Sequence, residues 1–490
     1  MDYRTFPIQD IINSGNIENS LRYIIQMQRD VKGKDLKIDF VDKSTVPMID
    51  SIVDEMIDAL PNEIWNHKTT FLNLACKDGA FVIKIFKKLF NSNDLKNYIE
   101  NETERAWYIL ENQIFIVCED ETTAKMLNTL LFSGNEIGDA HITWLNKLSD
   151  LQGLKNTNLK QYVYNRFRIT GNINKEETEK YMNFDVIIGN PPYNKGMDLD
   201  FVDMAYQMSK QYVSMITPAK WQTAEVEQKI TSKHLTYGYF RNTYVPHMSH
   251  VCFYPDCLDV FGISQADGIS WYLIDKNNTY EDKCKVVNKS KLQPLVNSEI
   301  TRDITKQQSL WNIGQEIVEY LGEYKKYKIE QVTNRKEYTI NINKQLRQSL
   351  SGAWDWENGG IRQEFIGKGG YIFSQKGHDI GVIDKIRVLK KGIDSSSGTS
   401  MNVFTSDDIE ECKSFYTWIN SKFTRFFILI NISSLTILNN NTFRFVPAPI
   451  IKEDGTYNWS IKYTDELLYK HYNIPQKYID IIEAIIKERK

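Results

Sequence analysis

Short apolar runs that alternate with amphipathic helical segments are the feature that most limits how this sequence can fold. The runs lie at Thr70–Leu74, Ile114–Val117, Phe184–Ile188 and Tyr212–Ile216. Such nearly continuous apolar runs are typical of strands that are buried on both faces of a sheet. Segments with helical spacing of apolar residues separate them, for example Thr122–Leu131 and Phe201–Lys210. The alternation predicts an α/β fold with a mostly parallel sheet up to about residue 290.

The sequence on either side of this region has a different character. Val46–Leu60 predicts a helix, because its apolar residues recur at a spacing of four. Beyond about residue 300 the sequence becomes polar and rich in Lys, Gln and Asn, with helices predicted at Ile409–Ile430 and Tyr478–Lys490. We therefore predict two domains, residues 1–300 and an α+β domain at residues 301–490.

The composition bears on the class and compartment of the protein. Hydrophobic residues make up 41% of the chain, which predicts a globular protein, and the net charge of -3 still allows a local basic patch. The six cysteines do not form a metal-binding or disulfide pattern. Without a signal peptide or an apolar run long enough to cross a bilayer, we expect a cytoplasmic protein with no membrane partner.

The sequence Asn190-Pro191-Pro192-Tyr193 follows one of the apolar runs directly. In open parallel sheets, ligands bind at the carboxyl ends of the strands, which is where this motif would lie. The Asn oxygen and a rigid backbone carbonyl can accept both hydrogens of an amino group, so that its lone pair points at a methyl donor. The tyrosine ring offers a face on which an extruded base can stack. A Pro-Pro turn that merely ends a strand is the alternative.

On this motif, the chain resembles the S-adenosylmethionine-dependent N6-adenine DNA methyltransferases of restriction-modification systems, the Asn-Pro-Pro-Tyr class. Phe-Leu-Asn-Leu-Ala-Cys-Lys-Asp-Gly-Ala-Phe at Phe71–Phe81 resembles the cofactor loop of that family, usually Asp-Pro-Ala-Cys-Gly-Ser-Gly-Ala-Phe. The cofactor motif precedes the catalytic motif and a long region follows both, which resembles the gamma arrangement. The resemblance covers most of residues 40–275 and implies a Rossmann-like class I methyltransferase domain.

The resemblance implies that S-adenosylmethionine is bound by residues of the loop, the following strand and the catalytic motif. These residues are Asn73, Ala75, Cys76, Gly79, Phe81, Glu119 and Asn190. Four positions depart from the family pattern: Asn73 stands for the acid, Leu74 for Pro, Lys77 for Gly and Asp78 for Ser. Glu119 fits the acid that binds the ribose hydroxyls best by position, and Asp120 or Glu121 could serve instead. An ordinary strand–helix turn is the alternative for the loop.

Other segments resemble the parts of the family that face the substrate. These implied substrate contacts are Tyr193, Lys220, Trp221 and Phe253, and core packing is the alternative for Lys220, Trp221 and Phe253. Lys385, Arg387, Lys390 and Lys391 form a basic stripe that either meets DNA phosphates or is a solvated charged face. The histidines His141, His247 and His250 fit no metal spacing, and we predict no metal.

Together these features predict a site-specific enzyme that methylates N6 of a flipped adenine in double-stranded DNA, with DNA bound between the two domains. Asn190, Pro191, Pro192 and Tyr193 are the predicted catalytic residues. If the chain belongs to a restriction system, we expect a separate restriction endonuclease subunit as a partner, because the N-terminal region lacks a recognisable nuclease pattern. A role in epigenetic marking or phage protection without any nuclease stays equally open. Two alternatives stay open. One is methyl transfer to a protein glutamine or an RNA base, and the other is a DNA-specificity subunit with weakened catalysis.

Overall fold

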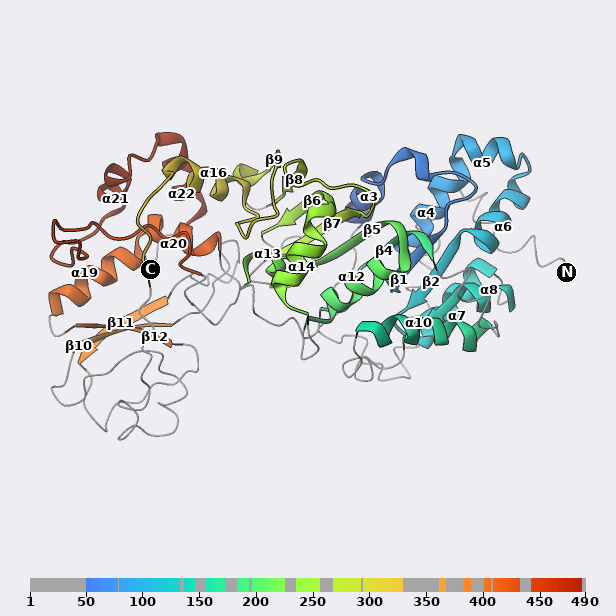
Figure 1. Ribbon diagram of the computed structural model, residues 1–490, viewed down its shortest axis with the longest axis horizontal. Helices are drawn as coiled ribbons and strands as arrows, with labels where there is room; N and C mark the ends of the chain where they lie inside the picture. Colours follow the sequence, from blue (N-terminus) through green and yellow to red (C-terminus); the bar gives the residue numbers. More distant parts are fainter. Residues whose placement is uncertain are drawn as a thin grey trace, which may run out of the picture.

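A computed structural model describes residues 50–77, 79–132, 136–145, 156–171, 183–193, 196–224, 235–255, 268–291, 294–328, 361–366, 382–388, 401–406, 409–431 and 442–486. Within these residues a long sheet runs through the middle of the molecule (Figure 1). A smaller group of helices and strands, formed by the C-terminal part of the chain, lies beyond one edge of this sheet.

The strands of the long sheet are β1 (Phe71–Cys76), β2 (Ile114–Cys118), β3 (Ile142–Trp144), β4 (Phe184–Gly189), β5 (Ser209–Pro218), β6 (Met248–Tyr254), β7 (Ile269–Asp275), β8 (Cys284–Asn288) and β9 (Ser298–Arg302). Their spatial order is β3-β2-β1-β4-β5-β7-β6-β8-β9. The strands from β3 to β5 pair in parallel, whereas β7 is antiparallel to β5 and β6. The predicted α/β fold with a mostly parallel sheet is thus confirmed, and β1 and β4 lie where the strand order reverses.

Helices cover both faces of this sheet. Against one face pack α3 (Asp50–Asp58), α4 (Ala80–Asn91), α6 (Glu102–Asn112) and α7 (Glu121–Phe132), and against the other pack α10 (Asn156–Gly171), α12 (Met197–Met208) and α14 (Tyr237–Thr243). Shorter elements are η2 (Asn62–Ile64), α5 (Asn93–Tyr98), α8 (Glu136–His141), α13 (Lys220–Thr223), η4 (Val245–His247) and η5 (Pro294–Val296). Burial of the sheet on both faces explains why its central strands are apolar throughout.

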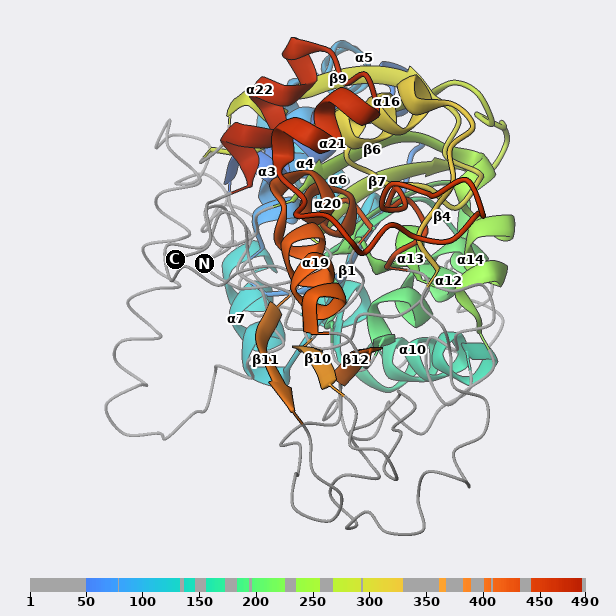
Figure 2. The same cartoon turned by 90° about the vertical axis from the view of Figure 1, so that its left-hand side faces the viewer.

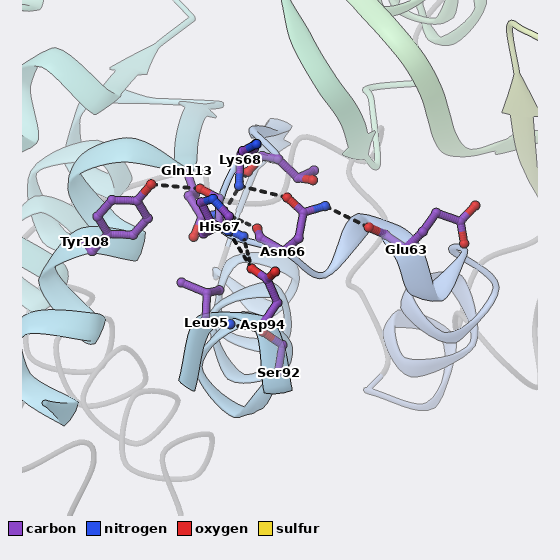
Figure 3. A network of polar contacts seen from close by, with 10 residues as sticks. Glu63, Asn66, His67, Lys68, Ser92, Asp94, Leu95, Tyr108 and Gln113 are labelled. Carbon is purple, nitrogen blue, oxygen red and sulfur yellow. Dashed lines mark hydrogen bonds and ion pairs between the residues drawn. The ribbon is translucent and has the colours of Figure 1, made fainter. Parts of the chain in front are cut away.

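The start of β1 is fixed by polar contacts to elements on both sides. Figure 3 shows the segment that leads into β1, where the ring of His67 contacts Asp94 at 2.7 Å and the Tyr108 hydroxyl donates to the His67 carbonyl. On the β4 side, the carboxylate of Asp185 accepts hydrogen bonds from the backbone N–H and the hydroxyl of Thr70, both at 2.8 Å. These contacts hold β1 and β4 in register at the ends opposite to their carboxyl termini.

The C-terminal part contains α16 (Asn312–Leu321), β10 (Ile361–Ile366), β11 (Val382–Val388), β12 (Met401–Ser406), α19 (Ile409–Asn420), α20 (Lys422–Leu429), α21 (Asp465–His471) and α22 (Gln476–Ile485). The three strands form an antiparallel sheet of order β11-β10-β12, and Figure 2 shows these elements in front of the long sheet. The prediction of a single helix at Ile409–Ile430 is wrong, because the segment forms two helices, α19 and α20. Ser421 lies between them and caps α20 by accepting a hydrogen bond from Thr424 N.

The apolar core continues from the long sheet into these C-terminal elements. Trp311, next to α16, packs edge-on against Phe253 of β6 at 6.1 Å, and Gly314 of α16 lies against Ile430. The Tyr478 hydroxyl of α22 donates to Glu316 of α16 at 2.7 Å. The domain boundary after residue 300 stays a prediction, and β9 crosses this position.

His141, at the end of α8, is a neutral core residue, which gives a prediction about stability. Burial lowers its pKa to about 4, and its ring contacts the Ile114 carbonyl at 3.0 Å. An unfolded histidine has a pKa near 6.5, so the stability that this group contributes is present above pH 6.5 and is lost as the pH falls toward 4. Between pH 7.5 and 5 we expect a loss of about 2 kcal/mol in the free energy of unfolding. Urea unfolding of His141→Gln should show a shallower pH dependence in this range, and an unchanged slope would contradict this account.

Candidate active site

The loop after β1 begins with an irregularity in the strand. The pairing of β1 with β2 shifts between Leu74 and Cys76, and Ala75 between them has a left-handed φ of 58°. Leu74 and Ala75 therefore both contact the same side of the core. A non-glycine residue in this conformation is uncommon and is often found at functional sites. The bulge lies at the carboxyl edge of the sheet, just before the last β1–β2 pair, Cys76 with Cys118.

Gly79 closes the loop and precedes α4. Its φ of 79° is left-handed, and a Cβ atom there would lie 3.0 Å from Leu127 of α7. The glycine thus allows both the turn and the close approach of α7. Phe81, in the first turn of α4, is buried in the core on one face of the sheet.

The Asn190-Pro191-Pro192-Tyr193 motif lies directly beside this loop. In the parallel pairing of β1 with β4, Leu74 is opposite Gly189, so that Ala75 and Asn190 follow a paired position on neighbouring strands. A Cβ atom at Gly189 would lie only 2.1 Å from the Leu74 carbonyl oxygen. Glycine is therefore required for the two strands to approach this closely. Asn190 is 2% exposed, Pro191 and Pro192 are buried, and Tyr193 is partly buried against the core.

Glu119 follows β2 on the other side of β1. Its backbone N–H donates to the Cys76 carbonyl at 3.1 Å, which aligns the ends of the two strands. Of the alternative acids, Asp120 accepts from the backbone N–H and hydroxyl of Thr123 and so caps α7. Glu121 pairs with Lys125 on the exposed side of α7. Of the three acids, Glu119 is thus the one that directly follows the paired ends of β1 and β2.

Lys77, which stands where the family has glycine, forms an ion pair with Glu119. Its Nζ lies 3.6 Å from Glu119 Oε1, and the two side chains are 13% and 17% exposed. In the sequence, Lys77 is visible only as a departure from the family pattern. The pairing follows from the adjacency of β1 and β2, which a single sequence does not display.

Asn73 connects the two strands of the site from within. Its side-chain Nδ2 donates to the Ile188 carbonyl of β4 at 3.0 Å, and the residue is 2% exposed. An aspartate, the residue that the family has here, could donate this hydrogen bond only when protonated. We expect Asn73→Asp to lower the free energy of unfolding by about 2–3 kcal/mol at pH 7, because it buries a carboxylate beside a carbonyl oxygen.

The same reasoning fixes how this loss should depend on pH. Burial and the nearby carbonyl oxygen of Ile188 disfavour the charged form, so the pKa of the introduced carboxyl group would lie above its ordinary value. The deficit relative to the wild type should therefore shrink as the pH falls and the acid becomes protonated. Chemical unfolding of both proteins at several pH values measures this, and equal stability at pH 7 would show that the amide donor is dispensable.

The residues at these strand ends fit the adenosine part of S-adenosylmethionine. Glu119 supplies a carboxylate that can accept hydrogen bonds from a ribose diol. Ala75 and Gly79 are small, which lets a ligand approach the backbone of the loop. Asn73 Oδ1 is buried and accepts no hydrogen bond from the described residues. Cys76 is buried beside Cys118 and faces the core.

The other three predicted substrate contacts, Lys220, Trp221 and Phe253, differ in how deeply they are buried. Trp221 is fully buried, and its indole N–H donates to Ser270 at 3.2 Å, so the packing alternative applies to it. Phe253 is also buried, in contact with Trp311, and packs in the core. Lys220 is partly exposed, with its Nζ 5.8 Å from the centre of the Tyr237 ring. Of the three, Lys220 keeps access to the surface.

Half of the basic stripe lies outside the residues that the structure describes. Lys385 and Arg387 belong to β11, opposite Glu364 and Arg362 of β10 in the pairing, whereas Lys390 and Lys391 lie outside the described residues. In the described part of the chain, no group of three or more His, Cys, Asp or Glu residues is placed to hold a metal ion. Among the described helices, none combines the length and the apolar character needed to cross a membrane.

Comparison with known sequences finds similarity to methylases. Residues 112–200 match the family described as Eco57I restriction-modification methylase, a segment that runs from the end of α6 through the Asn-Pro-Pro-Tyr motif into α12. A curated relative, described as an uncharacterized adenine-specific methylase of Mycoplasma pneumoniae, is 25% identical; the match covers 33% of this chain. The matched region spans 50% of that relative's length.

Comparison with solved structures finds only low overall similarity. The M protein of the type I restriction enzyme EcoKI has a TM-score of 0.32 and 12% identity, with 51% of this chain and 49% of that chain covered. The DNA-bound type ISP restriction-modification enzyme LlaBIII has a TM-score of 0.36 and 10% identity, with 55% and 22% covered. An O-methyltransferase from Bacillus cereus has a TM-score of 0.28 and 12% identity, with 53% and 91% covered. Similarities at these TM-scores are too low to bear on function.

Proposed function

We propose that this protein transfers a methyl group from S-adenosylmethionine to N6 of adenine in double-stranded DNA. The observation that carries the proposal is the arrangement of Glu119, Ala75 and Asn190 at the carboxyl ends of three adjacent strands, β2, β1 and β4. The match of residues 112–200 to restriction-modification methylases and the similarity to an adenine-specific methylase support the same chemistry.

The catalytic motif would act by fixing hydrogen-bond acceptors. In this proposal the side-chain oxygen of Asn190 and the backbone carbonyl of Pro191 accept the two hydrogens of the adenine amino group. The nitrogen then becomes tetrahedral, and its lone pair is directed at the methyl group. Pro191 and Pro192 restrict the backbone, so the acceptors need little reorganisation when the amino group becomes positively charged. Tyr193 would stack on the extruded base.

The cofactor would be held by the strand ends on either side of β1. S-adenosylmethionine supplies an activated methyl group on a positively charged sulfur, so the chain itself needs no nucleophile. Glu119 would accept hydrogen bonds from the ribose hydroxyls, and the loop from Ala75 to Gly79 would contact the rest of the nucleoside through its backbone. Asn73 would contribute indirectly, since it holds β1 against β4.

DNA would bind on the carboxyl side of the sheet, where a base must reach Asn190. Residues 301–490 are proposed to recognise the target sequence, with Lys385 and Arg387 of β11 as candidate phosphate contacts and Lys390 and Lys391 next to them in sequence. Lys220, partly exposed after β5, is a further candidate contact near the site. A separate restriction endonuclease subunit stays a prediction.

The substrate class can be tested by transfer of a radioactive methyl group from S-adenosylmethionine to three acceptors in parallel. These are unmethylated bacterial DNA, total RNA and a protein lysate freed of nucleic acid. The proposal predicts labelled DNA only, and the label should be removed by nuclease digestion but not by protease. Labelling confined to RNA or protein would overturn the DNA assignment, and a wild-type protein that labels nothing but binds the cofactor would favour a specificity subunit.

A further inference from the structure

Lys77 introduces a positive charge into the loop where the family pattern has an uncharged glycine. The residue follows β1, and Glu119 follows β2. Because Cys76 and Cys118 are paired in the sheet and Glu119 N donates to the Cys76 carbonyl, positions 77 and 119 lie side by side. The pair is thus built by the strand register and not by a chance orientation of two long side chains.

The low solvent exposure of Lys77 and Glu119 strengthens the interaction between their charges. Both side chains are less than one-fifth exposed, at 13% for Lys77 and 17% for Glu119. A carboxylate with this little solvent loses much of its hydration and is stabilised by a nearby cation. Exposed pairs such as Lys125–Glu121, with side chains 72% and 53% exposed, are screened by water and contribute little. The Lys77–Glu119 pair is therefore more strongly coupled than a surface pair.

The distance of 3.6 Å shows how Lys77 acts on the carboxylate. It is longer than a direct hydrogen bond, for which 2.7–3.2 Å is usual. Lys77 thus compensates the charge without donating a hydrogen bond to Oε1.

We propose that Lys77 is a positioning residue for the cofactor: it holds the Glu119 carboxylate charged and oriented toward the ribose hydroxyls. This inference rests on the proposed use of S-adenosylmethionine. The alternative is that Lys77, at a position where the family has glycine, obstructs the loop and weakens the binding of S-adenosylmethionine. The two readings predict opposite changes in affinity when the charge is removed.

Calorimetric titration of the full chain with S-adenosylmethionine and with S-adenosylhomocysteine distinguishes them. Lys77→Met keeps the length of the side chain and removes its charge. We expect it to weaken binding of both ligands about tenfold, because the ribose is common to the two. Lys77→Arg, which keeps the positive charge, should bind both ligands within about threefold of the wild-type affinity. Lys84→Met, which removes a lysine of α4 paired with Asp54 of α3 at 2.8 Å, is the matched control and should bind normally.

A double-mutant cycle with Glu119→Gln tests whether Lys77 acts through Glu119. In the Glu119→Gln background, Lys77→Met should change affinity less than about twofold. Unchanged or tighter binding by Lys77→Met, or a full tenfold loss in both backgrounds, would overturn the proposal. If Lys77→Met does not fold, Lys77→Gly, which restores the family residue, gives the same comparison. A wild-type chain that binds neither ligand would instead overturn the proposed function, and this inference with it.

Discussion

Replacement of Asn190 by Ala is expected to slow methyl transfer at least about a thousandfold, because in the proposed mechanism it removes one of two acceptors that stabilise the developing charge on the amino nitrogen. Asn190 follows β4 directly and is 2% exposed, so its orientation is fixed by the surrounding chain. Cofactor affinity should change by less than about threefold, since a catalytic contact made in the transition state contributes little to ground-state binding. Single-turnover kinetics and calorimetry measure the two quantities separately.

A suitable control is Asn112→Ala, which removes an exposed asparagine whose side chain donates to the Tyr108 carbonyl at the end of α6. This variant should transfer methyl groups at the wild-type rate. Thermal unfolding of both variants must show that the protein is intact. An Asn190→Ala protein that is folded and retains more than about a tenth of the wild-type rate would remove Asn190 from the mechanism.

The second large effect is expected at Gly189, where a methyl group has no room. In Gly189→Ala, the new Cβ would lie 2.1 Å from the Leu74 carbonyl oxygen, far inside any real contact. The obstacle is backbone of the neighbouring strand, so β1 and β4 must separate or lose their pairing. We expect a loss of about 3–5 kcal/mol in the free energy of unfolding, together with loss of cofactor binding where the strands separate.

Gly455→Ala provides the comparison that isolates this cause. Gly455 has a left-handed φ of 84°, but a Cβ atom there would meet nothing within 4 Å. Its replacement should therefore cost only about 1 kcal/mol from backbone strain. Denaturant unfolding of the two variants gives both values, and a Gly189→Ala protein as stable as Gly455→Ala would show that the strands tolerate separation.

The elements that the sequence predicts best are those whose signal is local. The apolar runs at Phe184–Ile188 and Ile114–Val117 became β4 and β2 with nearly the same bounds, since strands buried on both faces must be apolar throughout. The helix predicted at Phe201–Lys210 instead spans Met197–Met208, because β5 already begins at Ser209. The helix predicted at Ile409–Ile430 is divided at Ser421, because a serine can cap the start of a new helix. The spacing of apolar residues does not reveal such a cap.

The contacts that the sequence could not predict depend on which strands are neighbours. The Lys77–Glu119 pair joins the ends of β1 and β2, and Asn73 donates to a residue 115 positions away in β4. Asp120 matches the expected acid by residue type, yet it caps α7 through Thr123. Trp221 illustrates the reverse case, in which an aromatic residue after a strand end is buried in the core and is not available to a base.

The proposed function depends most directly on which nucleoside carries the methyl group. Unmethylated DNA incubated with the wild-type protein and S-adenosylmethionine, then digested to nucleosides, can be analysed by mass spectrometry. The proposed roles of Asn190 and Tyr193 predict N6-methyl-2′-deoxyadenosine, and its absence with Asn190→Ala. Methylation of cytosine alone, or no methylated nucleoside from a protein shown to bind the cofactor, would contradict the assignment of this site to adenine in DNA.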